Sequence, residues 1–187
     1  MASNYAENDF DPARLQRMLV DPARRSRHAA TLVRIAVEDR LDGIDLDYES
    51  LKAEDREPFS RFVETLGRGL RKAGKRLSVT VHPKFEEPGA WDGPKAQDLA
   101  RIERAADVVR VMTYDQHGPW SEPGPIAADA WVERVARFFL TKVPAKKLEL
   151  GVPWYGYDWA PKPPVSIVWE DRDWTGATVD PASGEWQ

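Results

Sequence analysis

Polar and apolar residues alternate within the segment 41–50, which reads LDGIDLDYES. Successive side chains of an extended strand point to opposite faces, so this segment presents carboxylates on one face and apolar groups on the other. The carboxylates are Asp45, Asp47 and Glu49, and the apolar groups are Ile44, Leu46 and Tyr48. Neighbouring carboxylates lie about 6–7 Å apart, and their repulsion should keep at least one protonated near neutral pH. The pattern is typical of a catalytic strand, because inward-facing carboxylates must be desolvated.

Two other interpretations of this segment fit less well. A solvent-facing antiparallel strand also alternates, but its polar face usually mixes Lys, Thr and Ser with acids. A calcium-binding loop that starts at Asp45 requires Gly at its sixth position and Glu at its twelfth, where this chain has Ser50 and Arg56. We therefore expect the acids to carry chemistry.

The same patterning predicts helices and strands in alternation. Helical spacing of apolar residues predicts helices over 21–40, 54–73, 96–106 and 128–143, with Asp21-Pro22 starting the first and Gly74 ending the second. Strands are predicted over 41–50, 77–81, 108–115 and 148–156, whereas 1–11 and 119–126 are expected to be loops. Strands that alternate with helices indicate βα units and a parallel sheet, that is, an α/β fold.

Polar and aromatic residues gather at the carboxyl ends of the predicted strands. In parallel α/β sheets this edge carries the functional site. The residues there are Glu49, His82, Tyr114, Asp115, Trp154 and Tyr155. Only one of the neighbouring Trp154 and Tyr155 can face inward from a strand. His82 is not assigned to the catalytic set, and Trp120 in its Pro/Gly-rich loop fits either a sugar platform or surface packing.

Composition narrows the function classes. The 187 residues suffice for one domain, and 27 basic against 31 acidic residues give a net charge of −4, which argues against nucleic-acid binding. The chain has no cysteine, and His28, His82 and His117 lack metal-ligand spacing, so neither a metal nor another cofactor is expected. No apolar run reaches the roughly 20 residues of a membrane span, and the N-terminus lacks a signal-peptide core. The eight Trp suit stacking on sugar rings.

Three motifs resemble glycoside hydrolase family 18, the chitinase-like enzymes. The segment 42–49, DGIDLDYE, is similar to the family signature D-x-x-D-x-D-x-E. Met112-Thr-Tyr114-Asp115 resembles its M-x-Y-D motif on the sixth barrel strand, and 150–159, LGVPWYGYDW, resembles the seventh strand. The run from 112 to 127 is similar to the branch associated with spore cortex and peptidoglycan, which often carries LysM repeats.

The resemblance implies a (β/α)8 TIM barrel, of which this chain holds only part. The acidic strand is then the fourth, and the segment 3–5 resembles the end of the third. We expect residues 1–160 to form a partial catalytic barrel, about strands 4–7 with their helices, and 161–187 to start an insertion or form an unassigned tail. The eighth-strand Trp of the family is unassigned, with Trp169 and Trp174 as the candidates.

The resemblance also implies a retaining, substrate-assisted mechanism. Glu49 would be the general acid, and a 2-acetamido group of the substrate would attack the anomeric carbon. Asp47 would orient that acetamide, Asp45 would share a proton with Asp47, and Tyr114 would donate a hydrogen bond to the acetamido oxygen. The expected substrate-binding residues are Asp115, Met112, Trp154 and Tyr155, whereas Asp42 is expected to be structural.

The expected substrate is a polysaccharide of 2-acetamido sugars, with chitin and peptidoglycan both left open. The alternatives are a non-catalytic glycan-binding module and an inactive truncated fragment; the presence of Glu49 favours the enzyme. The resemblance implies that the full-length protein is secreted or associated with the cell wall or spore, and that LysM-type repeats flank this domain.

Overall fold

Five parallel strands form the central sheet of the protein, in the order β1-β4-β5-β6-β7. The computed structural model describes residues 1–6, 9–168 and 178–185. The strands are β1 (Ala2–Ser3), β4 (Gly43–Asp47), β5 (Arg76–Val81), β6 (Val108–Val111) and β7 (Leu148–Leu150). Parallel strands joined by helices are the expected structure for part of a (β/α)8 barrel.

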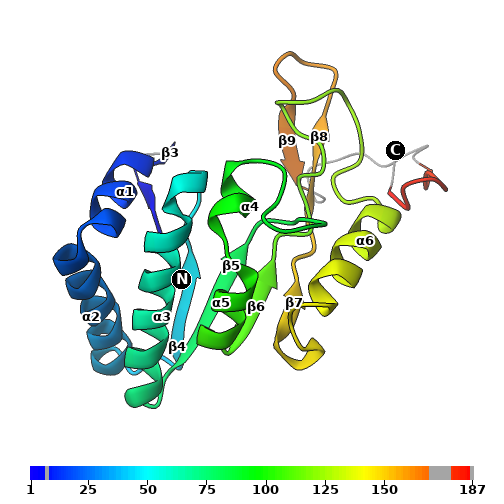
Figure 1. Ribbon diagram of the computed structural model, residues 1–187. Helices are drawn as coiled ribbons and strands as arrows, with labels where there is room; N and C mark the ends of the chain where they lie inside the picture. The colour runs from blue at the N-terminus through cyan, green and yellow to red at the C-terminus, as the bar shows by residue number, and fades with distance from the viewer. Residues whose placement is uncertain (7–8, 169–177, 186–187) are drawn as a thin grey trace.

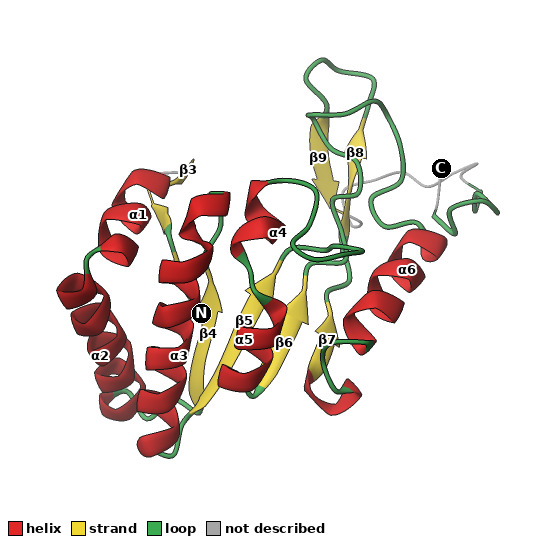
Figure 2. Cartoon of the chain, viewed as in Figure 1, coloured by secondary structure: helices red, strands yellow, loops and turns green. Residues whose placement is uncertain are grey.

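Helices cover one face of this sheet (Figures 1 and 2). The α-helices are α1 (Pro12–Val20), α2 (Pro22–Glu38), α3 (Arg56–Lys72), α4 (Asp92–Ala96), α5 (Leu99–Ala105) and α6 (Asp129–Leu140). Two short 3-10 helices, η1 (Ala53–Asp55) and η2 (Ala145–Lys147), precede α3 and β7. The Asp21 carboxylate caps α2 by accepting from the backbone N–H of Ala23 at 2.8 Å, as the sequence predicts. Gly74 follows α3 with φ of +68°.

The core lies between the helices and the sheet. Along β4 and just beyond it, Ile44, Leu46 and Tyr48 are buried, and the alternate residues are partly exposed. On α3, Phe59, Phe62, Leu66 and Leu70 are fully buried against that apolar face. The predicted two-residue period therefore turns the acids to the face of the sheet that the helices leave uncovered.

The N-terminal segment differs from the expected loop. Residues Ala2–Ser3 pair in parallel with β4, with Ser3 opposite Asp47, at the position where the third barrel strand is expected. Two residues are too few to show a period, so the pairing depends on β4 rather than on local pattern. Helix α1 is also absent from the predictions, although Asp11-Pro12 repeats the Asp-Pro signal and Asp11 accepts from the Arg14 N–H at 2.8 Å.

The strand predicted over 148–156 divides into two. β7 ends at Leu150, and the Gly151 N–H donates to Val111 O at 2.8 Å before the chain leaves the sheet. Pro153 then provides no N–H for a ladder. The strand β8 (Tyr155–Asp158) pairs instead with β9 (Val165–Val168) as an antiparallel hairpin, which projects beyond the carboxyl ends of the sheet strands (Figure 1).

Residues 2–10 contain a second small hairpin, in which β2 (Tyr5–Ala6) pairs with β3 (Asp9–Phe10). Among the helices described, none is long and apolar enough to cross a bilayer.

Candidate active site

A cavity of about 800 Å³ lies at the carboxyl ends of β4, β5 and β6. Of the predicted site residues, Glu49, Met112, Tyr114 and Asp115 line it together. The loop after β5, the loop after β6 and helix α6 complete the wall with His82, Phe85, Trp91, Trp120, Trp131 and Arg134. The structure therefore joins residues from three strands that are far apart in sequence.

Glu49 is held at the end of β4 by an asparagine from the start of the chain. The Glu49 N–H donates to Asn4 Oδ1 at 2.8 Å, and Asn4 Nδ2 donates back to the Glu49 carbonyl at 2.9 Å. Ser50 follows with φ of +58°, a left-handed conformation that is uncommon outside glycine. Burial, with the added charges of Asp47 and Asp115, raises the pKa of Glu49 to about 7.

Asp47 lies two positions before Glu49 on the same face. Its Oδ1 is buried and has no hydrogen-bond partner among the described residues. Burial raises the pKa of Asp47, the charge of Asp45 raises it further, and Arg110 opposes both effects. A buried carboxylate oxygen without a partner is a site that accepts a hydrogen bond from a ligand.

Asp45 lies deeper along the strand and has partners of its own. The Ser78 hydroxyl donates to Asp45 Oδ1, and Arg110 Nη1 forms an ion pair with the same oxygen at 2.8 Å. Arg110 Nη2 also pairs with Glu149 Oε2 at 2.8 Å. The acid row is thus partly neutralised by one arginine from β6.

Tyr114 and Asp115 close the opposite side of the site. The Tyr155 hydroxyl donates to Asp115 Oδ1, and the Tyr114 and Tyr155 rings meet edge-to-face with centroids 6.3 Å apart. Burial, with the nearby charge of Asp47, raises the pKa of Tyr114, which keeps its hydroxyl a donor. A Cβ at Gly151 would lie 2.7 Å from Tyr114 Cε1, so only glycine leaves room for this ring.

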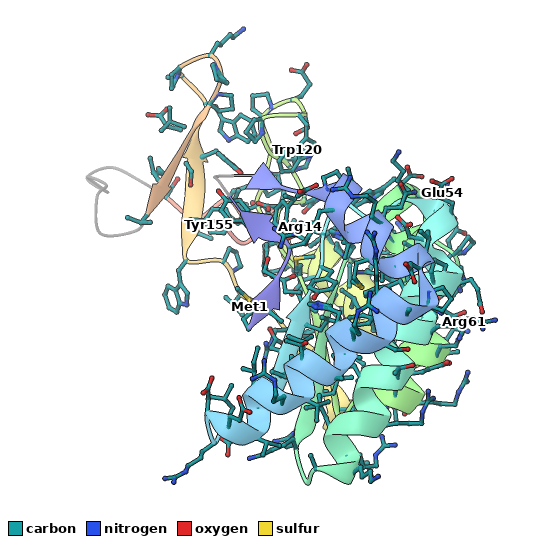
Figure 3. All side chains as sticks on the ribbon, turned by 90° about the vertical axis from the view of Figure 1, so that its left-hand side faces the viewer. Met1, Arg14, Glu54, Arg61, Trp120 and Tyr155 are labelled. Atoms are coloured by element: carbon teal, nitrogen blue, oxygen red, sulfur yellow. The ribbon has the colours of Figure 1, made fainter. Side chains whose placement is uncertain are left out.

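Trp154 stands apart from this group. Of the neighbours Trp154 and Tyr155, only Tyr155 contacts a predicted site residue; Trp154 is 80% exposed and does not line the cavity. Trp120 does line it, and Figure 3 shows Trp120 and Tyr155 on the side of the molecule away from Arg61. Trp169 and Trp174 lie outside the described residues.

Sequence reasoning did not assign a role to several residues of the site. Asn4 belongs to the segment that resembles the end of the third strand, but its bonds to Glu49 span 45 residues and leave no local signal. Arg110 does leave a local signal in the sequence, because it is a charged residue between Val109 and Val111, which are buried. Within the part of the chain that the structure describes, no three His, Cys, Asp or Glu side chains form a metal-binding group.

Comparison with known proteins identifies the family. Glycosyl hydrolases family 18 matches residues 7–181. The uncharacterized glycosylase YvbX of Bacillus subtilis is 35% identical over 159 residues, which are 84% of this chain and 46% of YvbX. The crystal structure of a class V chitinase from Pseudomonas fluorescens Pf-5 superposes with a TM-score of 0.88 at 31% identity, covering 97% of this chain and 58% of that one.

The chain therefore belongs to glycosyl hydrolase family 18, and the predicted partial α/β barrel is confirmed. The spore cortex-lytic enzyme SleL of Bacillus cereus has a TM-score of 0.81 at 25% identity, covering 90% of this chain and 40% of that one. This likeness agrees with the spore-cortex branch that the motifs indicate. The chain spans less than half the length of the curated relatives it matches.

Proposed function

We propose that this protein is a retaining glycoside hydrolase that cleaves β-linked, N-acetylglucosamine-containing polysaccharide by substrate-assisted catalysis. The observation that carries the proposal is the environment of Glu49. With a pKa of about 7, its carboxyl group holds a proton near neutral pH, as a general acid must. The cavity beside it is walled by aromatic rings, which suit the apolar faces of sugars.

The reaction has two steps at the anomeric carbon. Glu49 donates its proton to the glycosidic oxygen, and the bond between that oxygen and the anomeric carbon breaks. The 2-acetamido oxygen of the same sugar attacks that carbon from the opposite side and forms an oxazolinium ion. The Glu49 carboxylate then takes a proton from water, whose oxygen attacks the anomeric carbon and opens the ring. Two inversions give retention.

The neighbouring side chains hold the acetamido group in position. The unpartnered Oδ1 of Asp47 accepts the acetamido N–H, which directs the carbonyl oxygen at the anomeric carbon. The Tyr114 hydroxyl donates a hydrogen bond to that oxygen. Asp45 lies deeper on the same strand, and its negative charge helps to raise the pKa of Asp47.

Further residues bind the sugar. Asp115, fixed by the Tyr155 hydroxyl, accepts from a sugar hydroxyl, and Met112 packs beneath the ring. Trp154 is available to a sugar unit farther along the polymer, because its ring is exposed outside the cavity.

Relatives support two substrate classes, since one solved structure is of a chitinase and another of a spore cortex-lytic enzyme. We propose peptidoglycan or a chitin-like polymer as the substrate and the cell wall or spore as the location. The test is mass spectrometry of products after incubation with N-acetylglucosamine oligomers and with purified peptidoglycan strands. New saccharides with a reducing N-acetylglucosamine end are expected from one of them.

Substitution of the acids tests the assigned roles. Glu49→Gln should reduce turnover by about 10³-fold or more while leaving glycan affinity within a few-fold, because only the transferable proton is lost. Asp47→Asn should reduce turnover by at least about 10²-fold. Glu38→Gln, on the surface of α2 and paired with Arg34, serves as the matched control. Near-parental turnover in Glu49→Gln would exclude it as the acid, and glycan binding without products from the parent protein would indicate a binding module.

A further inference from the structure

His82 comes directly after β5, and Glu49 comes two residues after the end of β4. The β4–β5 register places Leu46 opposite Val79, and Glu49 and His82 each lie three residues beyond that pair. Adjacent strands lie about 4.8 Å apart, and both residues fall on the face of the sheet that carries the acids. His82 and Glu49 line the same cavity.

The imidazole of His82 has one nitrogen with no partner. The residue is 7% exposed, and its Nε2 is buried without a hydrogen bond to any described residue. Its backbone is firmly placed, because its N–H donates to Gln97 Oε1 at 2.8 Å. Burial, with the charge of Lys84, lowers the pKa of His82 to about 4, so the ring is neutral at physiological pH. Because His82 lines the cavity, a hydroxyl of a ligand bound there can supply the partner that Nε2 lacks.

Trp91 provides an aromatic surface next to that nitrogen. Its ring is 52% exposed, and its centroid lies 4.6 Å from that of His82. A Cβ at Gly93 would lie 2.4 Å from Trp91 Cζ3 and 2.6 Å from His82 Cδ2. The two rings therefore pack together over a position where any side chain would displace them.

A buried lysine holds the loop that presents Trp91. The side chain of Lys84 is 1% exposed, and its Nζ donates to Gln97 O at 2.6 Å and to Pro94 O at 3.0 Å. The same nitrogen pairs with Glu87 Oε1 at 3.2 Å. These contacts fix the loop on both sides of Trp91, so its ring is positioned before any ligand arrives.

We propose that Trp91 and His82 form a second sugar-binding subsite beside that of the acetamido sugar, in which a pyranose ring stacks on Trp91 and one of its hydroxyls bonds to Nε2 of His82. Tyr114, Met112 and Asp115, which hold the acetamido sugar, line the same cavity, so this subsite takes a neighbouring sugar of the same polymer. This subsite rests on the proposed function of Glu49.

Calorimetry of N-acetylglucosamine oligomers binding to the Glu49→Gln protein tests the subsite. Adding Trp91→Ala or His82→Leu should weaken affinity by about tenfold each, since each removes one stacking or hydrogen-bonding contact. His28→Leu is the matched control, because His28 packs against Phe62 and bonds to the Tyr48 hydroxyl outside the cavity. In the active protein the same variants should raise KM more than they lower kcat.

An NMR measurement tests the subsite with His82 and Trp91 unchanged, so it does not require that the Trp91→Ala and His82→Leu proteins fold. In imidazole ¹H–¹⁵N spectra of the Glu49→Gln protein, the Nε2 resonance of His82 should shift when the oligomer is added, and that of His28 should not. An unmoved His82 resonance, or unchanged affinity in both variants while the Glu49→Gln protein still binds glycan, overturns the subsite. Absence of both cleavage by the parent protein and glycan binding overturns the proposed function and the subsite together.

Discussion

Glu49 must donate a proton from a partly buried position, and its pKa sets the pH range in which the protein can be active. Because its pKa is about 7, the proton needed for catalysis is present below that pH and is lost above it. We expect kcat/KM to fall about tenfold per pH unit above pH 7. A pH–rate profile with an N-acetylglucosamine oligomer measures this limb.

One residue provides an internal check on that profile. The Asp115 charge contributes to the raised pKa of Glu49, so Asp115→Asn should move the falling limb to lower pH besides lowering the rate. A rate that keeps rising from pH 7 to pH 9 would contradict the assignment of Glu49 as the acid.

At the scale of elements, the loop between β5 and α4 depends on Lys84. Its buried ammonium group binds three carbonyl oxygens and the Glu87 carboxylate, and Lys84→Met would leave those acceptors without this donor. We expect a loss of about 3 kcal/mol in the free energy of unfolding. Chemical denaturation measures it, with the exposed Lys142→Met as control. A loss as small as that of the control would show that the loop is held by its other contacts.

At the scale of the whole molecule, Arg110 connects strands that do not neighbour one another. It lies on β6 and pairs with Asp45 on β4, across β5, and with Glu149 on β7. Arg110→Met should lower the free energy of unfolding by about 1–2 kcal/mol at pH 7.

The matched control is Arg137→Met, whose partner Glu133 lies one turn away on the surface of α6. That change should alter stability by less than about 0.5 kcal/mol at pH 7. Equal effects of the two substitutions in urea denaturation would show that the Arg110 network is only a surface pair.

Much of this fold follows from local sequence. Helices α2 and α3 and the alternation along β4 lie where periodicity predicts them, because each depends on residues within a few positions of one another. Strand β1, which the hydrophobic pattern leaves as a loop, and the divided 148–156 strand depend on distant partners: β1 on β4, and the chain after Leu150 on Val111 O and on β9. Side-chain period carries no information about such partners.

The sequence by itself determined the acid row, its spacing and the family, because the motif around Glu49 is contiguous. Only the tertiary structure decided what surrounds that row. Asn4 holds the Glu49 backbone, Arg110 pairs with Asp45, and His82 packs on Trp91 beside the acid. The physical reason is that solvation, charge and cavity shape arise where separate strands end together, and the order of strands in the sheet sets which ends meet.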